Sequence, residues 1–268
     1  MAHKNPPIQV ISLGAGVQSS TMALMAAEGE LPMPQCAVFA DTFGESAETY
    51  EWLNWLEGEL PYPVYRVTNG PLAERMLIVR EAKSGKKYMS PMIPCFIKKK
   101  DGTPGMMHRQ CTSQHKIRPI QRKLKALKKE ANSISVDIWL GISTDEASRM
   151  KPSQVLYVDR RYPLIDKGMN RQDCLDWMNT HGHPTPPRSS CVYCPYHSPD
   201  EWKNLKDNHP KDFAKAVAVD KELREKLSQT DIKGEGYLHR SLVPLDEVVF
   251  TGADTNMFIN DCEGICGT

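Results

Sequence analysis

The chain has 268 residues, of which 40% are hydrophobic, so it can form one large α/β domain or a smaller domain with a long extension. No apolar run approaches about 18 residues and the start lacks the apolar core of a signal peptide, so we expect a cytoplasmic protein with no membrane partner. The net charge of +1 does not by itself indicate a nucleic-acid partner.

The first predicted elements are a buried strand over 8–13 and a helix, joined by a turn of small residues over 14–16. Backbone N–H groups at such a helix start favour phosphate as a ligand, and two serines add hydroxyl donors. The P-loop pattern fails because Gln18 replaces its Lys, and the dinucleotide pattern fails because Ser19 replaces its third Gly. An ordinary strand-to-helix turn is the alternative.

Strands then alternate with helices along the chain. A strand over 36–40 ends at Asp41, a helix covers 45–60, and a strand over 63–67 precedes a helix over 71–82. This alternation predicts a parallel sheet with right-handed crossovers. Ligands of such sheets bind beyond the carboxyl ends of the strands, where the first turn and Asp41 would both lie.

The middle of the chain carries its one concentrated basic region. Residues 84–110 are predicted to form a long loop, and a helix follows over 112–130 with an interruption near Pro119. The basic side chains favour contact with phosphate or with an RNA or DNA backbone, and a solvated helix face is the alternative. These side chains are His115, Lys116, Arg118, Arg122, Lys123, Lys125, Lys128 and Lys129.

Strands over 136–142 and 155–158 complete the predicted sheet. We predict a nucleotide-binding α/β domain over 1–166 and a helical extension with a cysteine-containing tail over 167–268. The helices expected in the extension cover 170–180, a region opened by Ser198, and 212–227.

Eight cysteines are many for a cytosolic chain, in which structural disulfides are rare. Cys191 and Cys194 form a CxxC motif, and Cys262 and Cys266 form a CxxxC motif near the end. This grouping indicates metal or redox chemistry before disulfides. The remaining cysteines, Cys36, Cys95, Cys111 and Cys174, are scattered.

Several motifs along the chain fit one family pattern. They are the loop 12–20, the segments 39–42 and 48–51, Cys111 with Lys116 and Pro119, and Gly141 followed by Asp145, Glu146 and Arg149. Together they resemble the 3'-phosphoadenylylsulfate (PAPS) reductase family of the PP-loop, adenine nucleotide alpha hydrolase-like superfamily. A phage and bacterial branch of that family looks similar, and it resembles the sulfurtransferases of DNA phosphorothioation.

The resemblance implies an α/β fold in which a five-stranded parallel sheet, flanked by helices, holds an adenine nucleotide, either ATP or PAPS. Asp41 would lie near the nucleotide or its magnesium ion, and Lys116 and Arg149 would neutralise phosphate or sulfate oxygens. Ordinary surface charges are the alternative for all three. The implied nucleotide-binding residues are Ser12, Gly14, Ala15, Gly16, Gln18, Ser19, Ser20, Asp41 and Gly141.

The resemblance also implies a 4Fe-4S cluster on Cys111, Cys191 and Cys194, although Thr112 replaces a second cysteine of the family pattern. The fourth iron would be bound by Cys262, by Cys266 or by a non-cysteine ligand, or would stay open. A tetrahedral zinc on the CxxC and CxxxC cysteines, or with His197, is the structural alternative, and absence of any metal is a third.

Three functions follow from these expectations. The first is an ATP-using sulfurtransferase that adenylates a nucleic-acid or nucleotide acceptor, releases pyrophosphate and takes sulfur from a donor. The second is a reductase of PAPS or adenylylsulfate, in which the Cys266 thiol attacks sulfur and a thiol reductant completes the reaction. The third is an inactive nucleotide-binding regulator, because Gln18 departs from the usual Asp of the loop. A homodimer is possible in each case.

Overall fold

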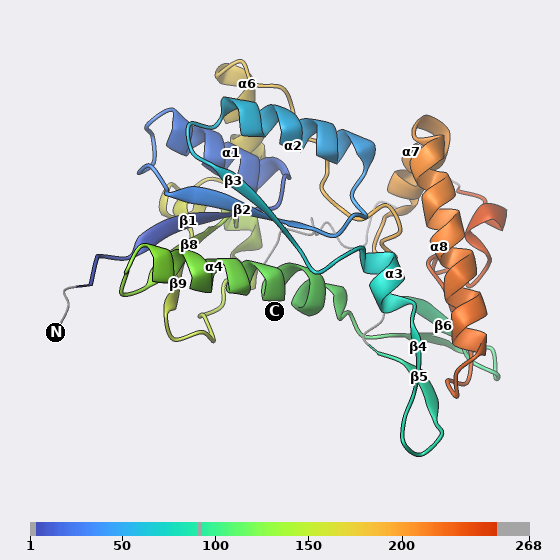
Figure 1. Ribbon diagram of the computed structural model, residues 1–268. Coiled ribbons are helices and arrows are strands. Elements are labelled where there is room, and N and C mark those ends of the chain that lie inside the picture. The colour runs from blue at the N-terminus through green and yellow to red at the C-terminus, as the bar shows by residue number, and fades with distance from the viewer. Residues whose placement is uncertain (1–3, 91–92, 251–268) are drawn as a thin grey trace.

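A computed structural model describes residues 4–90 and 93–250 of the chain. At its centre lies a five-stranded sheet in the order β3-β2-β1-β8-β9, in which all neighbouring strands are parallel (Figure 1). The predicted α/β fold class is therefore confirmed. The strands are β1 (Ile8–Leu13), β2 (Cys36–Asp41), β3 (Val64–Thr68), β8 (Val136–Leu140) and β9 (Val158–Arg161).

Both faces of this sheet are buried because its strands alternate apolar side chains between two cores. Ile11 and Leu13 of β1 point into a core with the helices above the sheet, whereas Ile8 and Val10 point into a core with the helix below it (Figure 1). The upper helices are α1 (Val17–Ala27), α2 (Ala47–Glu59) and α6 (Arg171–Thr180), and the lower helix is α4 (Arg118–Glu130).

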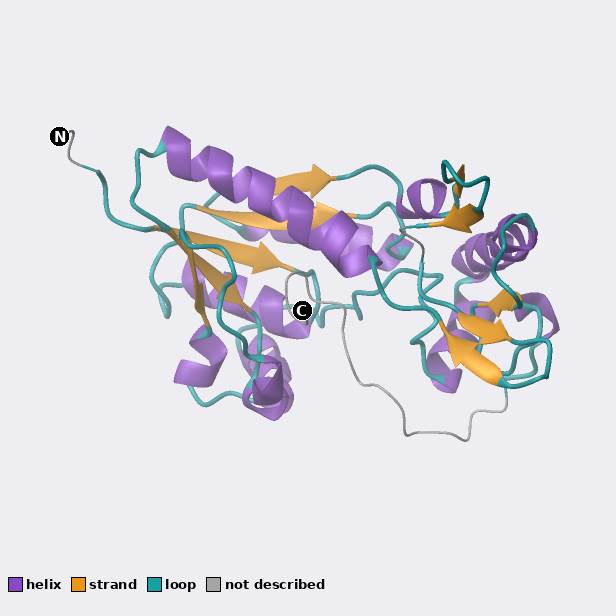
Figure 2. Ribbon diagram, turned by 90° about the horizontal axis from the view of Figure 1, so that it is seen from below, coloured by secondary structure: helices purple, strands orange, loops and turns teal. Residues whose placement is uncertain are grey.

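A second group of elements lies beside the large sheet (Figure 2). Its core joins side chains from 72–97 with side chains from 192–245, on both sides of the predicted domain boundary at Asp166. That boundary stays a prediction. The elements are α3 (Leu72–Met76), β4 (Val79–Glu81), β5 (Lys87–Met89), β6 (Phe96–Lys98), β7 (Pro104–Met106), α7 (Pro199–Asn208), α8 (Pro210–Ser228), β10 (Glu235–Tyr237) and the 3-10 turn Leu245–Glu247.

Two local predictions in this group were wrong. The expected loop over 84–110 contains three short strands, and the expected helix over 71–82 ends at Met76 because the chain turns into the β4-β5 hairpin. Strand β6 pairs with β7 nearby and with β10 at 235–237, so one of its two partner strands lies far away in sequence.

The interruption predicted near Pro119 is a π-helical turn over Thr112–Ile117, directly before α4. Pro119 is the second residue of α4, and because it has no N–H group it cannot donate to a carbonyl of the turn before it, which agrees with the interruption at this point. Capping boxes begin α6 at Asn170 and α7 at Ser198, the two residues at which the sequence predicted a helix to start. Within the described ranges, no helix combines the length and apolar character needed to cross a bilayer.

Candidate functional site

The order of the strands places the β1-to-α1 turn at a topological switch point. From β1 the chain moves outward to β2 and β3, then returns to the other side of β1 as β8 and β9. In open α/β sheets ligands bind in the crevice at this point, outside the carboxyl ends of the strands. Both Gly14, after β1, and Gly141, after β8, lie there.

The turn over 14–16 is shaped by its own side chains. Ser19 Oγ accepts a hydrogen bond from the Gly14 N–H group at 3.1 Å and donates to the Gly16 carbonyl at 3.3 Å. Ala15 has a φ of 60°, a left-handed conformation that glycine adopts without strain. Helix α1 begins at Gly16 with no side-chain cap, so its first N–H groups are aimed at the switch point without a side-chain acceptor.

Gln18 is buried and joins the turn to two other segments. Its Nε2 atom donates to Ser143 Oγ and to Glu146 Oε2, both at 3.3 Å, and its Oε1 atom accepts from Arg171 Nη1 at 2.8 Å. An amide can donate to a carboxylate and accept from a guanidinium at once, whereas an aspartate here would repel Glu146. Arg149 donates to the other oxygen of Glu146 at 2.5 Å. The Glu146 carboxylate therefore connects Arg149 to Gln18.

Three other predicted residues of this region also pack tightly. A Cβ atom on Gly141 would lie 2.7 Å from Ser19 N, so glycine lets β8 approach the turn closely. Ser20 Oγ accepts from Trp52 Nε1 at 3.0 Å. Ser12 Oγ is buried and has no hydrogen-bond partner among the described residues.

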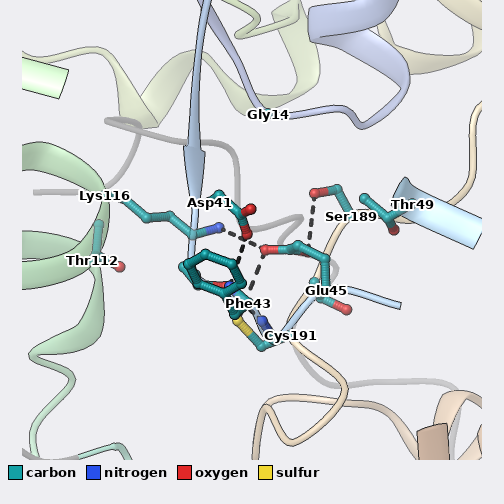
Figure 3. A network of polar contacts seen from close by, with 12 residues as sticks. Gly14, Asp41, Phe43, Glu45, Thr49, Thr112, Lys116, Ser189 and Cys191 are labelled. Carbon is teal, nitrogen blue, oxygen red and sulfur yellow. Dashed lines mark hydrogen bonds and ion pairs between the residues drawn. The ribbon is translucent and has the colours of Figure 1, made fainter. Parts of the chain in front are cut away.

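Asp41 ends β2 beside this region, with 9% of its surface exposed. Its Oδ1 atom accepts from Tyr50 OH at 2.7 Å and from Phe43 N at 2.8 Å. Burial and the hydrogen bond to Asp41 raise the pKa of Tyr50 well above its usual value, so this phenol stays protonated and keeps donating. Phe43 has a φ of 57° and leaves 56% of its surface exposed next to Asp41 (Figure 3).

Glu45 is the centre of a buried polar network that the sequence analysis missed (Figure 3). Lys116 Nζ lies 3.5 Å from Glu45 Oε1, and the two side chains are 7% and 0% exposed. Ser189 Oγ donates to Oε2 at 3.4 Å, and Cys191 Sγ donates to Oε1 at 3.8 Å. Thr42 Oγ1 contacts the same Cys191 sulfur at 3.3 Å. The signal available in the sequence was the polar run 41–46, which directly follows a buried strand.

Three of the four predicted metal-ligating cysteines line one cavity. Cys111 comes from the start of the π-helical turn, and Cys191 and Cys194 come from the CxxC turn. Thr112, at the position of the missing cysteine, accepts from Arg109 Nε at 2.7 Å through its hydroxyl. Other residues lining the cavity include Thr42, Arg109, Lys116, Arg188, Tyr193, Tyr196 and His197.

The cavity holds the described ligands of both predicted metal sites. Cys111, Cys191 and Cys194 belong to the predicted 4Fe-4S cluster, and Cys191, Cys194 and His197 belong to the predicted zinc site. Both metal assignments stay predictions. Cys262 and Cys266 lie outside the described residues.

His197, the alternative zinc ligand, is held in the neutral form. Burial and the nearby Arg188 charge lower the pKa of its imidazole to about 3. Its Nε2 atom is 2.9 Å from Ser190 Oγ, and its buried Nδ1 atom has no hydrogen-bond partner among the described residues.

The basic helix divides into a buried and an exposed part. His115 and Lys116 are buried and point away from solvent, so they do not belong to an exposed basic face. Arg122 donates to Asn69 Oδ1 at 3.1 Å beside a shallow hollow of the surface. The exposed basic side chains are Arg118, Arg122, Lys125 and Lys129, whose helical spacing forms one stripe along α4.

No family model matches the chain. A curated relative is the uncharacterized 37.8 kDa protein in the gpa 5' region of Escherichia phage 186, 23% identical over 205 residues, which are 76% of this chain and 54% of the relative. The chain thus spans about half the length of that protein. A phosphate complex of phosphoadenylyl-sulfate (PAPS) reductase from Candida auris matches with a TM-score of 0.40 and 13% identity, over 68% of this chain and 75% of the reductase. Membership of the PAPS reductase family stays a prediction.

Proposed function

We propose that this protein is a PP-loop-type sulfurtransferase that binds ATP at the β1/β8 switch point, adenylates an acceptor and transfers sulfur to it. The observation that carries the proposal is the cavity lined by three cysteines, which reaches the strand ends through Lys116 and Thr42. A phosphate site and a sulfur site on one edge of a sheet are the two parts that such a reaction requires.

Phosphate binding is the role proposed for the uncapped start of α1. Arg149 and Lys116 are the residues proposed to supply positive charge to the phosphates, and Asp41 is the proposed ligand of a magnesium ion. An acceptor oxygen attacks the α-phosphorus of ATP and pyrophosphate leaves, after which a sulfur nucleophile attacks the acceptor atom that bears the activated oxygen, and AMP leaves with that oxygen. Phe43, exposed beside Asp41, offers an apolar ring on which a base can stack.

Sulfur handling is the role proposed for the cysteine-lined cavity. The thiolates of Cys111, Cys191 and Cys194 would hold a 4Fe-4S cluster, which supplies Lewis-acidic iron able to bind sulfide. Glu45 accepts a hydrogen bond from Cys191 Sγ and so can take its proton, while Lys116 offsets the resulting charge.

The acceptor proposed here is a nucleic acid, because the exposed basic side chains of α4 form one stripe of positive charge that a phosphate backbone would neutralise. We expect replacement of Arg118, Arg122, Lys125 and Lys129 by Gln to weaken DNA binding and to flatten its dependence on salt concentration. The measurement is a salt titration of fluorescent duplex DNA, with Lys203→Gln and Lys211→Gln on α7 and α8 as the control. Unchanged binding by the α4 variant would remove the nucleic-acid acceptor from the proposal.

The second candidate is the PAPS reductase, in which the tail thiol of Cys266 attacks the sulfur of PAPS and the nucleotide leaves. A thiol reductant then releases sulfite from the enzyme-bound thiosulfonate. A protein that binds nucleotide and releases neither pyrophosphate nor sulfite is the inactive regulator.

One experiment separates these functions. Protein purified without oxygen is incubated with ATP, sulfide and duplex DNA, or with PAPS and a thiol reductant, and pyrophosphate and sulfite are measured. We expect pyrophosphate from the first mixture and no sulfite from the second, and the reverse result would overturn the proposal. The Cys194→Ser variant should lose the transfer of sulfur to the DNA and the visible absorption of iron-sulfur, while Cys174→Ala, a buried thiol outside the cavity, should keep both.

A further inference from the structure

Helices α1 and α6 end in the same way. Each is followed by a Gly between two identical residues: EGE at 28–30 and HGH at 181–183. Gly29 and Gly182 have φ values of 85° and 73°, and in both segments the residue after the glycine donates its N–H group to a carbonyl five residues earlier, at 2.9 Å. Both ends are therefore Schellman turns.

The two helices lie side by side, so their two ends meet (Figure 1). Arg171 Nη1 binds Gln18 Oε1 where the helices begin. Where they end, His183 Nε2 lies 2.7 Å from Glu28 Oε1, and His181 Nε2 lies 3.4 Å from Glu30 Oε1 and 3.7 Å from Glu28 Oε2. Two imidazoles and two carboxylates are thus gathered at one point.

The surroundings orient these groups as metal ligands. His181 Nδ1 lies 2.8 Å from the Trp177 carbonyl and donates to it, so Nε2, the atom that faces the carboxylates, is the ring atom that would bind a metal ion. Trp177 Nε1 donates to Glu30 Oε1 at 2.8 Å and fixes that carboxylate. The indole of Trp177 also stacks on the His181 ring, with centroids 4.1 Å apart.

The charge at this point also favours a cation. Each helix C-terminus carries partial negative charge, and α1 has no basic residue in its last turn. The carboxylates of Glu28 and Glu30 add to this negative charge. Lys167 offsets part of it with one positive charge, and its Nζ atom is 3.5 Å from Glu30 Oε2. A divalent ion would neutralise the remainder.

We propose that Glu28, Glu30, His181 and His183 form a binding site for a divalent transition metal of the zinc class, separate from the cysteine-lined cavity. Nitrogen and oxygen ligands about 2.1 Å from a tetrahedral zinc lie about 3.4 Å apart. The distances from His181 Nε2 to the two carboxylates match that spacing, and the ligand atoms of Glu28, Glu30 and His181 all lie within 4.8 Å of one another. Bound metal fastens the end of α6 to the end of α1.

The test is a calorimetric titration of the full chain with Zn²⁺, followed by thermal unfolding with and without the ion. Because thiolates are zinc ligands and the cavity cysteines can add to the titration, the His183→Asn and Glu28→Gln variants are titrated beside the wild-type protein. His209→Asn is the matched control, since His209 forms an isolated pair with Glu48 at 3.6 Å. We expect each site variant to bind one equivalent of zinc fewer than the wild-type protein. The His209→Asn control should bind as many equivalents as the wild-type protein.

Cobalt, whose absorption spectrum depends on its ligands, shows which ligands hold the metal equivalent that the site variants lose. The difference between the Co²⁺ spectra of wild-type and His183→Asn protein should lack intense sulfur-to-metal absorption. Zinc should also raise the unfolding temperature of the wild-type protein more than that of either site variant. Equal stoichiometry in all proteins, or a difference spectrum that shows sulfur ligation, would overturn the proposal.

Discussion

The ion pair between Lys116 and Glu45 is the residue-scale feature with the largest expected effect on stability. Both side chains are nearly inaccessible, so removing one charge takes an ion-pair partner away from the other in a place that water barely reaches. We expect Glu45→Gln and Lys116→Met each to lower the free energy of unfolding by about 3–5 kcal/mol in urea titrations. The double variant should lose clearly less free energy of unfolding than the two single variants lose together, because it leaves neither charge of the pair buried. Additive losses would mean that the two charges are not coupled.

The thiols should separate into an inert and a reactive class. Burial raises the pKa of Cys36 to about 11 and that of Cys95 to about 12, so at pH 8 roughly a thousandth or less of either is thiolate. After treatment with a strong chelator, we expect iodoacetamide to modify Cys191 and Cys194 well before these two. Mass spectrometry of the peptides after timed quenching measures the order. Equal rates of modification for Cys95 and Cys191 would mean that the Cys95 thiol is not buried.

At the scale of elements, the contact between the end of β8 and the start of α1 sets the shape of the phosphate turn. A methyl group on Gly141 would meet the Ser19 backbone at 2.7 and 2.8 Å, and backbone cannot move aside as a side chain can. We expect Gly141→Ala to cost about 1–3 kcal/mol of stability and to weaken ATP binding. Thermal unfolding and nucleotide titration measure the two effects.

Gly58 provides the matched control for this substitution. It lies in α2, and a Cβ atom there meets nothing within 4 Å. Gly58→Ala should therefore leave ATP binding unchanged and stabilise the protein by roughly 0.5–1 kcal/mol. If both alanine variants behaved alike, the close approach of β8 to the turn would not be what requires glycine at Gly141.

The elements that could be predicted are those whose signals are local. The large sheet follows from apolar strands that alternate with helices, and Asn170 marks a helix start by its own side chain. Strand β6 could not be predicted, since it has three residues and pairs with β10 more than a hundred residues away. For the same reason the sequence indicated Lys116 and Cys191 separately but not Glu45, which joins them only in the folded chain.

At the scale of the whole molecule, the cysteine-lined cavity belongs to two parts of the structure. Thr42 reaches it from the end of β2 in the large sheet and Lys116 from the π-helical turn before α4, while Ile93 and Tyr193 belong to the core of the second group of elements. The thiols are therefore positioned only when both parts are folded against each other. Sequence distance hides this dependence, because Cys111 and Cys191 are 80 residues apart in the chain.

This arrangement predicts that residues 1–166 do not form a stable unit, although they contain the whole large sheet. Truncation after Asp166 removes α6 and so uncovers α1, and it also exposes Leu72, Met76 and Ile97, whose partners lie at 192–245. We expect this fragment to aggregate or to unfold without cooperativity in urea, as exposed apolar surface requires. A fragment of 1–184, which keeps α6, should be more soluble. Its unfolding should still not be cooperative, because Leu72, Met76 and Ile97 stay exposed. A sharp urea transition with native-like circular dichroism for 1–166 would show instead that the large sheet folds alone.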